Sequence, residues 1–528
     1  MSAPIDPIEL AVFQNAMTSI AEEMGAALRR SAVSPNIKER RDYSCAIFDG
    51  RARVIAMGDH MPVHLGSMPM SVLAAVQSLQ LNEGDVGILN DPYAGGTHLP
   101  DITMVMPVFA NTREPIFYVA ARAHHSDVGG MFAGSMGPAR EIFQEGIRIP
   151  PVHIVRSGVM QKDVLQLILY NVRTPTEREG DLAAQIGACR IGEERLIHLS
   201  ERYTPQHLVQ LCEHLLDHSE RLVRAELRSL PAGEYFAEDF LDDDGVSADP
   251  VRIAVTLRLN PGAETLELDF TGTSPQVRGS INAVRAITLS ACLYVLRCLL
   301  PEGSPTTAGT LLPLTLKTAP GTVVDAESPA AVAGGNVETS QRIVDTILRA
   351  FAQAAPNRIP AASAGTMSNL TIGGIDPRRN LPFTYYETIA GGMGAGPFRD
   401  GTSGVHTHMT NSLNTPTESL EFEYPLRVKQ YSYRRGSGAE GKFCGGDGLV
   451  REFELLADAQ LTLLADRQKF APYGLSGGST GASGKTTALI PGESAPTQLS
   501  AKSSQHLPHG TVVRIETPGG GGWGAPNS

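Results

Sequence analysis

The sequence lacks the features that mark several large classes of protein. No stretch reaches the roughly 18 consecutive apolar residues that a membrane-spanning helix needs. The N-terminal segment Met1–Met17 has no charged region followed by an apolar core, so no signal peptide is expected. The net charge is −12, and no basic run is longer than Lys38–Arg41, whereas nucleic-acid-binding proteins concentrate basic residues on one surface. These absences predict a chain that binds neither membranes nor nucleic acid.

Cysteine is also scarce, with 6 residues scattered along 528 and none in a CxxC pair. A disulfide framework or a zinc site made of thiolates needs closely spaced cysteines, so both are excluded. Isolated cysteines in a chain of this length are typical of reduced, mostly buried thiols. The sequence therefore predicts a cytoplasmic protein.

The composition is that of a globular protein, with 42% apolar and 19% charged residues. A chain of 528 residues is too long for one ordinary hydrophobic core, so several lobes are expected. We expect an α+β fold with mixed and antiparallel sheets, and a C-terminal β region rich in Gly and Pro. The predicted lobes are a metal-site lobe over 1–180, a helical segment over 181–245, an α+β lobe over 246–368 and a β-rich lobe over 369–528.

The spacing of apolar residues predicts the main elements of these lobes. Asp6 and Pro7 are typical of a helix start, and apolar residues recur at helical spacing after them. Alternating apolar residues on either side of Asp49-Gly50 predict a β-hairpin. The full prediction comprises helices over 7–30, 70–81, 285–300 and 338–354, a helix pair over 180–230 broken near Pro205, and hairpins over 42–58 and 251–274.

Two kinds of Gly-rich segment invite a nucleotide-binding interpretation that their spacing does not support. The P-loop motif needs four residues between its first Gly and its Gly-Lys pair, but Ser479 holds the position of that first Gly relative to Gly484. We expect the segment over 477–487 to be a flexible surface loop. The segments over 391–396 and 519–522 lack dinucleotide-binding spacing and predict tight turns or close backbone packing, with a substrate-lining loop as the alternative.

The strongest group of polar residues lies at the ends of two predicted strands. His98 and Asp101 are three residues apart, and Pro100 between them disfavours a helix, so a rigid loop must orient both side chains. His124, His125 and Asp127 end a second strand. Adjacent strand residues face opposite ways, so only one of the two histidines is expected in the site, while Asp127 could orient a ligand imidazole.

Histidines and carboxylates without thiolates suit a divalent Zn, Mn or Fe ion. The alternative is a hydrogen-bonded polar cluster within an ordinary turn. Asp42, His60 and His64 lie nearby in sequence, and each taken alone is more typical of a structural residue.

Seven ordered motifs span almost the whole chain and together resemble the hydantoinase B family. That family includes the β subunit of ATP-dependent N-methylhydantoinase, the second half of 5-oxoprolinase, lactamase relatives, and a subunit of acetone and acetophenone carboxylases. The motifs are "NDPYAGGTHLPDITMVMPVF", "AHHSDVGG", "EIFQEGIRIPP", "DFTGTSPQVRGSINA", "GGNVETSQRIVD", "RRGSGAEGKFCGGDG" and "TPGGGGWGAP".

The resemblance implies a metal held by Asp42, His98, Asp101 and His124. It also implies a separate ATPase subunit of the hydantoinase A type in an αβ or α2β2 assembly, with ATP bound by that subunit and not by this chain. The ATPase would phosphorylate the carbonyl oxygen of a small cyclic amide, and water activated at the metal would then open the ring.

Further residues are candidates for roles in this chemistry. Asp127 or His125 could shuttle the proton. Two alternatives to ring hydrolysis remain open: a subunit of an acetone or acetophenone carboxylase, and a non-catalytic scaffold for the ATPase. The candidates for substrate binding are Asn336, Glu338, Ser340 and Gln341. The alternative is that these residues cap a helix.

Overall fold

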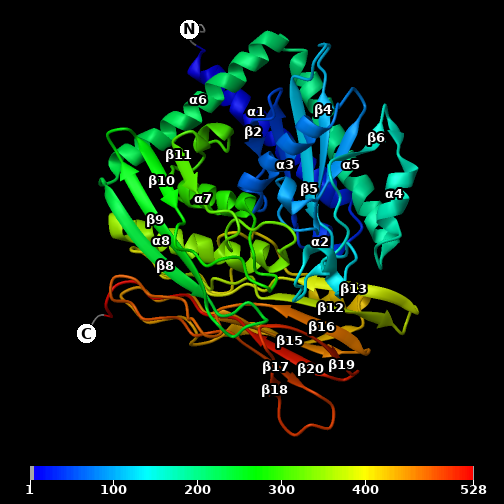
Figure 1. Ribbon diagram of the computed structural model, residues 1–528, viewed down its shortest axis with the longest axis vertical. Coiled ribbons are helices and arrows are strands. Elements are labelled where there is room, and N and C mark those ends of the chain that lie inside the picture. Colours follow the sequence, from blue (N-terminus) through cyan, green and yellow to red (C-terminus); the bar gives the residue numbers. More distant parts are fainter. Residues whose placement is uncertain (1–4, 527–528) are drawn as a thin grey trace.

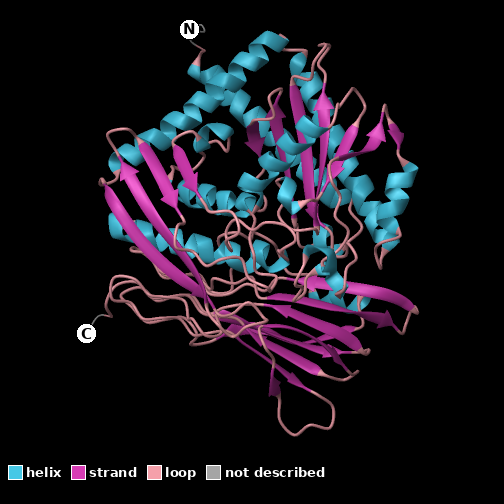
Figure 2. Cartoon of the chain, viewed as in Figure 1, coloured by secondary structure: helices cyan, strands magenta, loops and turns pink. Residues whose placement is uncertain are grey.

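The computed structural model describes residues 5–526, which form an α+β fold, as the sequence predicts. Four sheets are present in this part of the chain, two of them in the C-terminal region. Figure 1 shows the N-terminal two-thirds of the chain above and the C-terminal sheets beneath it. The helices gather in the upper part and the lower part is almost entirely strand and loop (Figure 2). None of the described helices is both long and apolar enough to cross a membrane.

The first sheet has seven strands in the order β2-β1-β5-β4-β3-β6-β7. Its two faces are covered by different helices, because alternate strand residues point to opposite sides. Cys45 and Ile47 pack with α1 (Pro7–Ser31) and α5 (Pro175–Ser200), whereas Ala46 and Phe48 pack with α3 (His64–Ser78). The strands are β1 Tyr43–Asp49, β2 Val54–Met57, β3 Val86–Leu89, β4 Asp101–Val108, β5 Phe117–His124, β6 Val152–Arg156 and β7 Val159–Met160, and the shorter helices are α2 Pro35–Lys38 and α4 Lys162–Leu169.

The N-terminal predictions hold, with one displaced boundary. The Asp6 side chain accepts a hydrogen bond from the Ile8 amide at the start of α1, and the hairpin turns after Asp49. The helix predicted from Met70 instead begins at His64 and includes Pro69. A tertiary contact sets this start, since the Val63 amide donates to the Met409 carbonyl.

The second sheet has the order β11-β10-β9-β8. The predicted break between two long helices is present, because α5 ends at Ser200 and α6 starts at Pro205. The predicted lobe boundaries remain predictions, although β8 lies before residue 245 and pairs with β9. The elements are α6 Pro205–Ser229, β8 Gly233–Leu241, β9 Val251–Asn260, β10 Thr265–Asp269, α7 Arg285–Leu299, β11 Leu314–Lys317 and α8 Ser340–Ala354.

Two antiparallel sheets form the C-terminal region and share one hydrophobic core. Their orders are β13-β12-β16-β19 and β14-β15-β20-β17-β18. A single short α-helix, α9 (Thr417–Glu423), occurs in the described residues after α8. The strands are β12 Asn369–Asp376, β13 Leu381–Glu387, β14 Leu426–Arg434, β15 Gly448–Leu455, β16 Ala459–Leu464, β17 Lys485–Leu489, β18 Thr497–Gln498, β19 Lys502–Leu507 and β20 Val512–Glu516.

Close backbone packing explains the Gly-rich C-terminal segments. A Cβ atom on Gly519 would lie 1.9 Å from the Ser437 carbonyl oxygen, and one on Gly520 would lie 2.0 Å from that of Met393. No larger residue fits at either position. The loop that resembles a P-loop is held in the same way, since the Ser479 amide donates to the Glu440 carbonyl. Strand β17 follows it directly, whereas a P-loop is followed by a helix.

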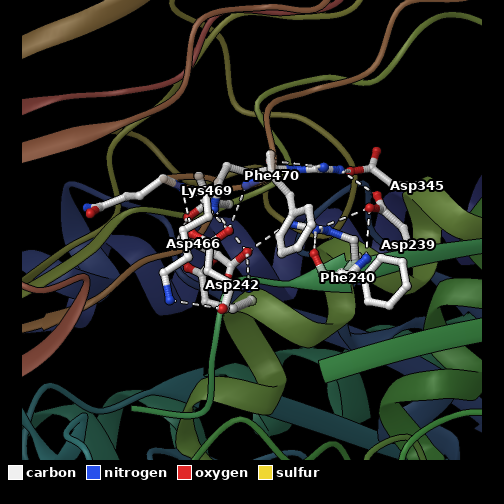
Figure 3. A network of polar contacts seen from close by, with 12 residues as sticks. Asp239, Phe240, Asp242, Asp345, Asp466, Lys469 and Phe470 are labelled. Carbon is white, nitrogen blue, oxygen red and sulfur yellow. Dashed lines mark hydrogen bonds and ion pairs between the residues drawn. The ribbon is translucent and has the colours of Figure 1, made fainter. Parts of the chain in front are cut away.

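A buried ionic network joins the second sheet and α8 to the C-terminal region (Figure 3). Arg467 is 2.9 Å from Asp239 and 2.5 Å from Asp345. Asp466 is 2.8 Å from both Arg342 and Lys502. Permanent cations therefore neutralise these buried carboxylates and fix the loop after β16 against the rest of the molecule.

Candidate metal centre

Strand register brings the predicted metal ligands together. Asp101 is the first residue of β4 and His124 is the last of β5, and the two are paired across the sheet. His98 precedes β4 in a tight turn closed by a hydrogen bond from the Asp101 amide to the His98 carbonyl. The turn therefore places His98 beside the strand pair, although its sequence is typical of an ordinary polar loop.

The Asp101 carboxylate is at the centre of the cluster. Its Oδ1 is 3.3 Å from His98 Nε2 and 3.5 Å from His124 Nδ1. Its Oδ2 accepts a hydrogen bond of 2.5 Å from Thr97 and lies 3.2 Å from His64 Nε2. One possible ligand atom from each of His98, Asp101 and His124 lies within 4.8 Å of the others. This spacing suits a single bound ion.

The polar atoms of the cluster are prepared for a cation. His98 Nε2 and His124 Nδ1 face Asp101 Oδ1, while the opposite ring nitrogens, His98 Nδ1 and His124 Nε2, are buried and have no hydrogen-bond partner in the described chain, although such atoms are normally paired. Burial lowers the pKa of His124. Burial opposes ionisation of Asp101, but the His98 and His64 imidazoles hold the pKa of that carboxyl well below its usual range. A neutral imidazole and an ionised carboxylate are the forms that bind metals, so the residues fit a divalent ion.

Asp42 lies next to this cluster, immediately before β1. Its backbone carbonyl accepts a hydrogen bond of 3.0 Å from the His124 amide. Its side chain is buried, and burial raises its pKa while the nearby His124 lowers it. The compact group of ligand atoms comprises His98, Asp101 and His124 without Asp42. The structure thus places the fourth predicted ligand beside the group and not within it.

His125 and Asp127, predicted to move protons, have other partners. His125 points away from the cluster and donates from Nε2 to Gln185 Oε1 of α5 at 2.8 Å. Burial, and then the Arg178 charge, lower the pKa of His125 to about 4. The buried Asp127 carboxylate forms an ion pair of 2.9 Å with the half-buried Arg173. The alternation of strand residues accounts for the opposite directions of His124 and His125.

Two residues of the cluster carry no signal for this role in the sequence. His64, whose own sequence context is structural, contacts Asp101 and also bonds to the Ser44 hydroxyl at 2.8 Å. The ring of Tyr386, in β13, stacks on the His124 ring, with 4.4 Å between ring centroids, and the Arg40 guanidinium lies over the Tyr386 ring. Only the fold brings a C-terminal strand to this site, so no local motif could have identified Tyr386.

The predicted substrate-binding segment begins at a single π-helical turn, Gly335–Thr339. Such turns occur frequently at functional sites. The Asn336 side-chain nitrogen is 3.0 Å from His98 Nε2, so this residue reaches the cluster. The Asn336 side-chain oxygen is buried and has no hydrogen-bond partner among residues 5–526. Asn336 therefore contacts His98 through one end of its side-chain amide and keeps the other end unpartnered.

The other three residues of this segment fix its conformation. Glu338 accepts a hydrogen bond of 3.1 Å from the Met367 amide, and burial raises its pKa to about 8. Ser340 donates to the Asn336 carbonyl at 2.7 Å, and Gln341 donates to the Thr407 carbonyl at 3.0 Å. These contacts hold the π turn against the C-terminal region.

Glu145 anchors the loop before the π turn. Its Oε1 accepts two hydrogen bonds of 2.9 Å, from the amides of Val332 and Ala333. The side chain is 2% exposed, and burial raises its pKa to about 8. The sequence offers a signal for Glu145 only as part of the motif "EIFQEGIRIPP", in which it is one of two glutamates. It is a positioning residue for Asn336.

Comparisons with known proteins find relatives along almost the whole chain. The chain is 41% identical to an uncharacterized protein of Methanocaldococcus jannaschii, over 99% of this chain and 91% of that protein. It is 38% identical to 5-oxoprolinase 1 of Arabidopsis thaliana over 98% of this chain, which corresponds to only 42% of that protein. It is 33% identical to a Pseudomonas protein named as the putative B-type subunit of a D-/L-hydantoinase, over 99% and 90% of the two chains.

Two solved structures have the same fold. ATP-dependent caprolactamase from Pseudomonas jessenii matches with a TM-score of 0.92 and 29% identity, over 99% of this chain and 92% of that one. Acetone carboxylase matches with a TM-score of 0.89 but 17% identity, over 99% and 76%, which shows a shared fold alone. The model of the family Hydantoinase B/oxoprolinase matches residues 6–526. Because that match spans almost the whole chain, the chain belongs to the hydantoinase B/oxoprolinase family.

Proposed function

We propose that the chain is the metal-binding subunit of an ATP-dependent amidohydrolase that opens hydantoin, 5-oxoproline or lactam rings. The observation that carries this proposal is the buried group of His98, Asp101 and His124, whose possible ligand atoms lie within 4.8 Å of one another. The opposite ring nitrogens, His98 Nδ1 and His124 Nε2, are buried without a partner, and an unpaired buried polar group costs about 1–3 kcal/mol, which disfavours a purely structural cluster. The same argument disfavours a non-catalytic scaffold.

His98, Asp101 and His124 would hold the ion, with Asp42 as a fourth ligand from the adjacent strand end. Zn, Mn and Fe all suit this donor set. When bound, such an ion supplies Lewis acidity and lowers the pKa of water. Thr97 and His64 both contact Asp101 Oδ2, which leaves Oδ1 directed toward the other two histidines. They orient the central ligand, as residues surrounding metal ligands commonly do.

The contacts of His125 and Asp127 favour positioning over proton transfer. Their hydrogen bonds to Gln185 and Arg173 fix the segment after β5 and thereby the direction of His124. Asn336 is the side chain best placed to hold a substrate or water near His98. Glu338, Ser340 and Gln341 would contribute indirectly, by holding the turn that carries Asn336.

ATP would be used by a separate subunit of the hydantoinase A type. A cyclic amide is a weak electrophile, and phosphorylation of its carbonyl oxygen would make the carbon reactive and create a leaving group. This division of labour is supported by the Arabidopsis 5-oxoprolinase, in which this chain corresponds to about two-fifths of a longer protein. It is also supported by the name of the Pseudomonas relative, which describes one subunit of a hydantoinase. An αβ or α2β2 assembly is expected.

The second candidate is a subunit of an acetone-type carboxylase. The fold shared with acetone carboxylase favours it, but at 17% identity a shared fold does not specify a reaction. A solved relative at 29% identity is a caprolactamase, and this favours ring hydrolysis.

The decisive experiment measures metal content and ATP consumption of this chain with its ATPase subunit, over hydantoins, 5-oxoproline and lactams. We expect one divalent ion per chain and substrate-dependent ATP consumption. Asp42→Asn should lower metal affinity about tenfold or more, whereas Asp376→Asn, a buried aspartate paired with Arg378, should not change it. If Asp42→Asn binds metal like the unmodified chain, Asp42 is not a ligand, and His64 becomes the fourth candidate.

A further inference from the structure

Two adjoining cavities lie along α7, apart from the candidate metal centre. The first, of about 180 Å³, lies between α3, α7 and the segment over 306–311. The second, of about 250 Å³, continues it toward the segment over 57–62. Together they reach the range of roughly 300–1,000 Å³ that is typical of small-molecule sites. Among residues 5–526, neither lining includes a candidate metal ligand. The residues that line both cavities are Leu65, Arg297 and Thr306.

The first cavity is apolar over most of its wall. Leu289, Leu293 and Arg297 are spaced four residues apart, so they follow one face of α7 and leave the cationic residue at one end of it. No described aspartate or glutamate lines this cavity. An aliphatic group is therefore favoured inside it, because burial of apolar surface is stabilising. The α3 side chains that contribute to the wall are Leu65, Pro69, Met70 and Leu73.

Two arginines line this cavity, and only one of them has a carboxylate partner. Arg53 is 2.6 Å from both Asp49 and Glu213, and its hydrogen bond to Glu213 raises its pKa. Arg297 forms no ion pair with any residue that the structure describes. Its hydrogen bonds both come from Nη1, and they end on a carbonyl and a hydroxyl of the segment over 304–306. The Nε and Nη2 groups of Arg297 therefore remain available to a ligand.

The surroundings of Arg297 favour a ligand with a single carboxylate. The residue is half-buried, and burial lowers its pKa, an effect that the Asp59 charge offsets only in part. A guanidinium binds a carboxylate through two parallel hydrogen bonds, which its Nε and Nη2 groups can supply. A second carboxylate on the ligand would meet Asp59 in the second cavity, or would be buried without a cation in the apolar one.

We propose that these cavities bind an aliphatic monocarboxylate, with its carboxylate on Arg297 and its hydrocarbon chain in the apolar cavity between α3 and α7. The site goes beyond the proposed function, because it requires neither the metal ion nor a ring amide. Binding is therefore testable with the full chain alone, in the presence of a chelator and without ATP or a partner subunit. Failure of the metal assignment would leave this binding intact.

The experiment measures binding of hexanoate, hexan-1-ol and adipate at pH 7 by calorimetry or ligand-observed NMR. These probes share a six-carbon chain and carry one, no and two carboxylates. We expect hexanoate to bind at least about tenfold more tightly than either of the others, because hydrogen bonds between charged groups are the strong ones. Arg297→Met should remove this preference without weakening the binding of hexan-1-ol. Leu73→Trp narrows the apolar cavity and should weaken the binding of both hexanoate and hexan-1-ol.

Matched variants at exposed positions provide the controls. Arg399→Met and Leu381→Trp make the same changes outside the cavities and should leave hexanoate binding unchanged. Absence of hexanoate binding to the unmodified chain would overturn the proposal, as would equal affinity for hexan-1-ol or adipate. Unchanged hexanoate binding by folded Arg297→Met would overturn it as well. If Arg297→Met does not fold, the comparison of the three probes and the effect of Leu73→Trp decide the question.

Discussion

Two buried, carboxylate-rich regions of the molecule satisfy their charges in different ways. At the metal centre, the ion pairs of Asp101 are all with histidines, and two of these keep an unpartnered nitrogen. In the ionic network of Figure 3, Asp466 instead pairs with Arg342 and Lys502, which are charged at every physiological pH.

The difference lies in which groups compensate the buried carboxylates. Burial opposes ionisation of Asp466, but Lys502 and Arg342 lower the pKa of that carboxyl, so the network is neutralised without a ligand. Around Asp101 the compensating groups are imidazoles whose own pKa values burial lowers, as for His64 and His124. The centre therefore carries a carboxylate without a permanent cation, and a metal ion would supply the missing positive charge.

The largest expected effect comes from breaking the ionic network. Arg467→Met removes the nearest cation from the buried carboxylates of Asp239 and Asp345, and should lower the free energy of unfolding by about 3–5 kcal/mol. Urea denaturation measures it, with exposed Arg399→Met as a control that should change little. A loss below about 1 kcal/mol would show that the network does not hold the lobes together.

The next effect concerns the metal centre. Added metal at 100 times its dissociation constant should stabilise the unmodified chain by about 2.7 kcal/mol, because only the folded state offers the site. Asp101→Asn should gain nothing from metal and should abolish activity. Arg467→Met should keep the full gain, since the network is independent of the cluster. Metal titrations followed by thermal unfolding test both, and a normal metal content in Asp101→Asn would exclude the site.

Removing His125 should have a smaller and different effect. His125→Ala leaves the Gln185 oxygen without its donor, which should cost about 1–3 kcal/mol of stability. Metal content should be unchanged, because this ring points away from the cluster. His98→Ala is the matched variant and should lose the metal. Elemental analysis of the two proteins distinguishes them, and loss of metal from His125→Ala would contradict the orientation of the ring.

The smallest effect is a change in how steeply the free energy of unfolding depends on pH, and Glu145 causes it. Burial raises its folded-state pKa to about 8, above an unfolded value near 4.5, so its stabilising contribution is full below pH 4.5 and is lost as pH rises through 8. Glu145→Gln keeps an oxygen for the Val332 and Ala333 amides but does not titrate. Between pH 6 and 7 the free energy of unfolding of the unmodified chain should fall by about 1 kcal/mol relative to that of this variant. If the stabilities of the unmodified chain and of Glu145→Gln change with pH in parallel, the raised pKa of Glu145 is contradicted.

Local sequence predicted those parts of the molecule that local interactions determine. The capping of α1 by Asp6 and the turn after Asp49 depend on near neighbours, and both were predictable. His98 and Asp101 could be grouped because they share one turn, whereas the choice of His124 over His125 rested on the family resemblance.

Long-range packing sets the features that the sequence did not predict. The start of α3 depends on a bond to Met409, and the stacking of Tyr386 on His124 depends on the position of the C-terminal sheets. The ionic network is of the same kind, because its aspartates and arginines resemble ordinary surface charges until the fold buries them.

The backbone packing of Gly519–Gly522 has a consequence for the order in which the chain acquires its structure. These glycines lie between the loops that contain Met393, Ser437, Glu440 and Tyr473, at separations that leave no room for a side chain. The loops close around this segment, so they lack part of their native packing until it has been synthesised. The C-terminal region therefore completes its folding only after residues 519–522 are available.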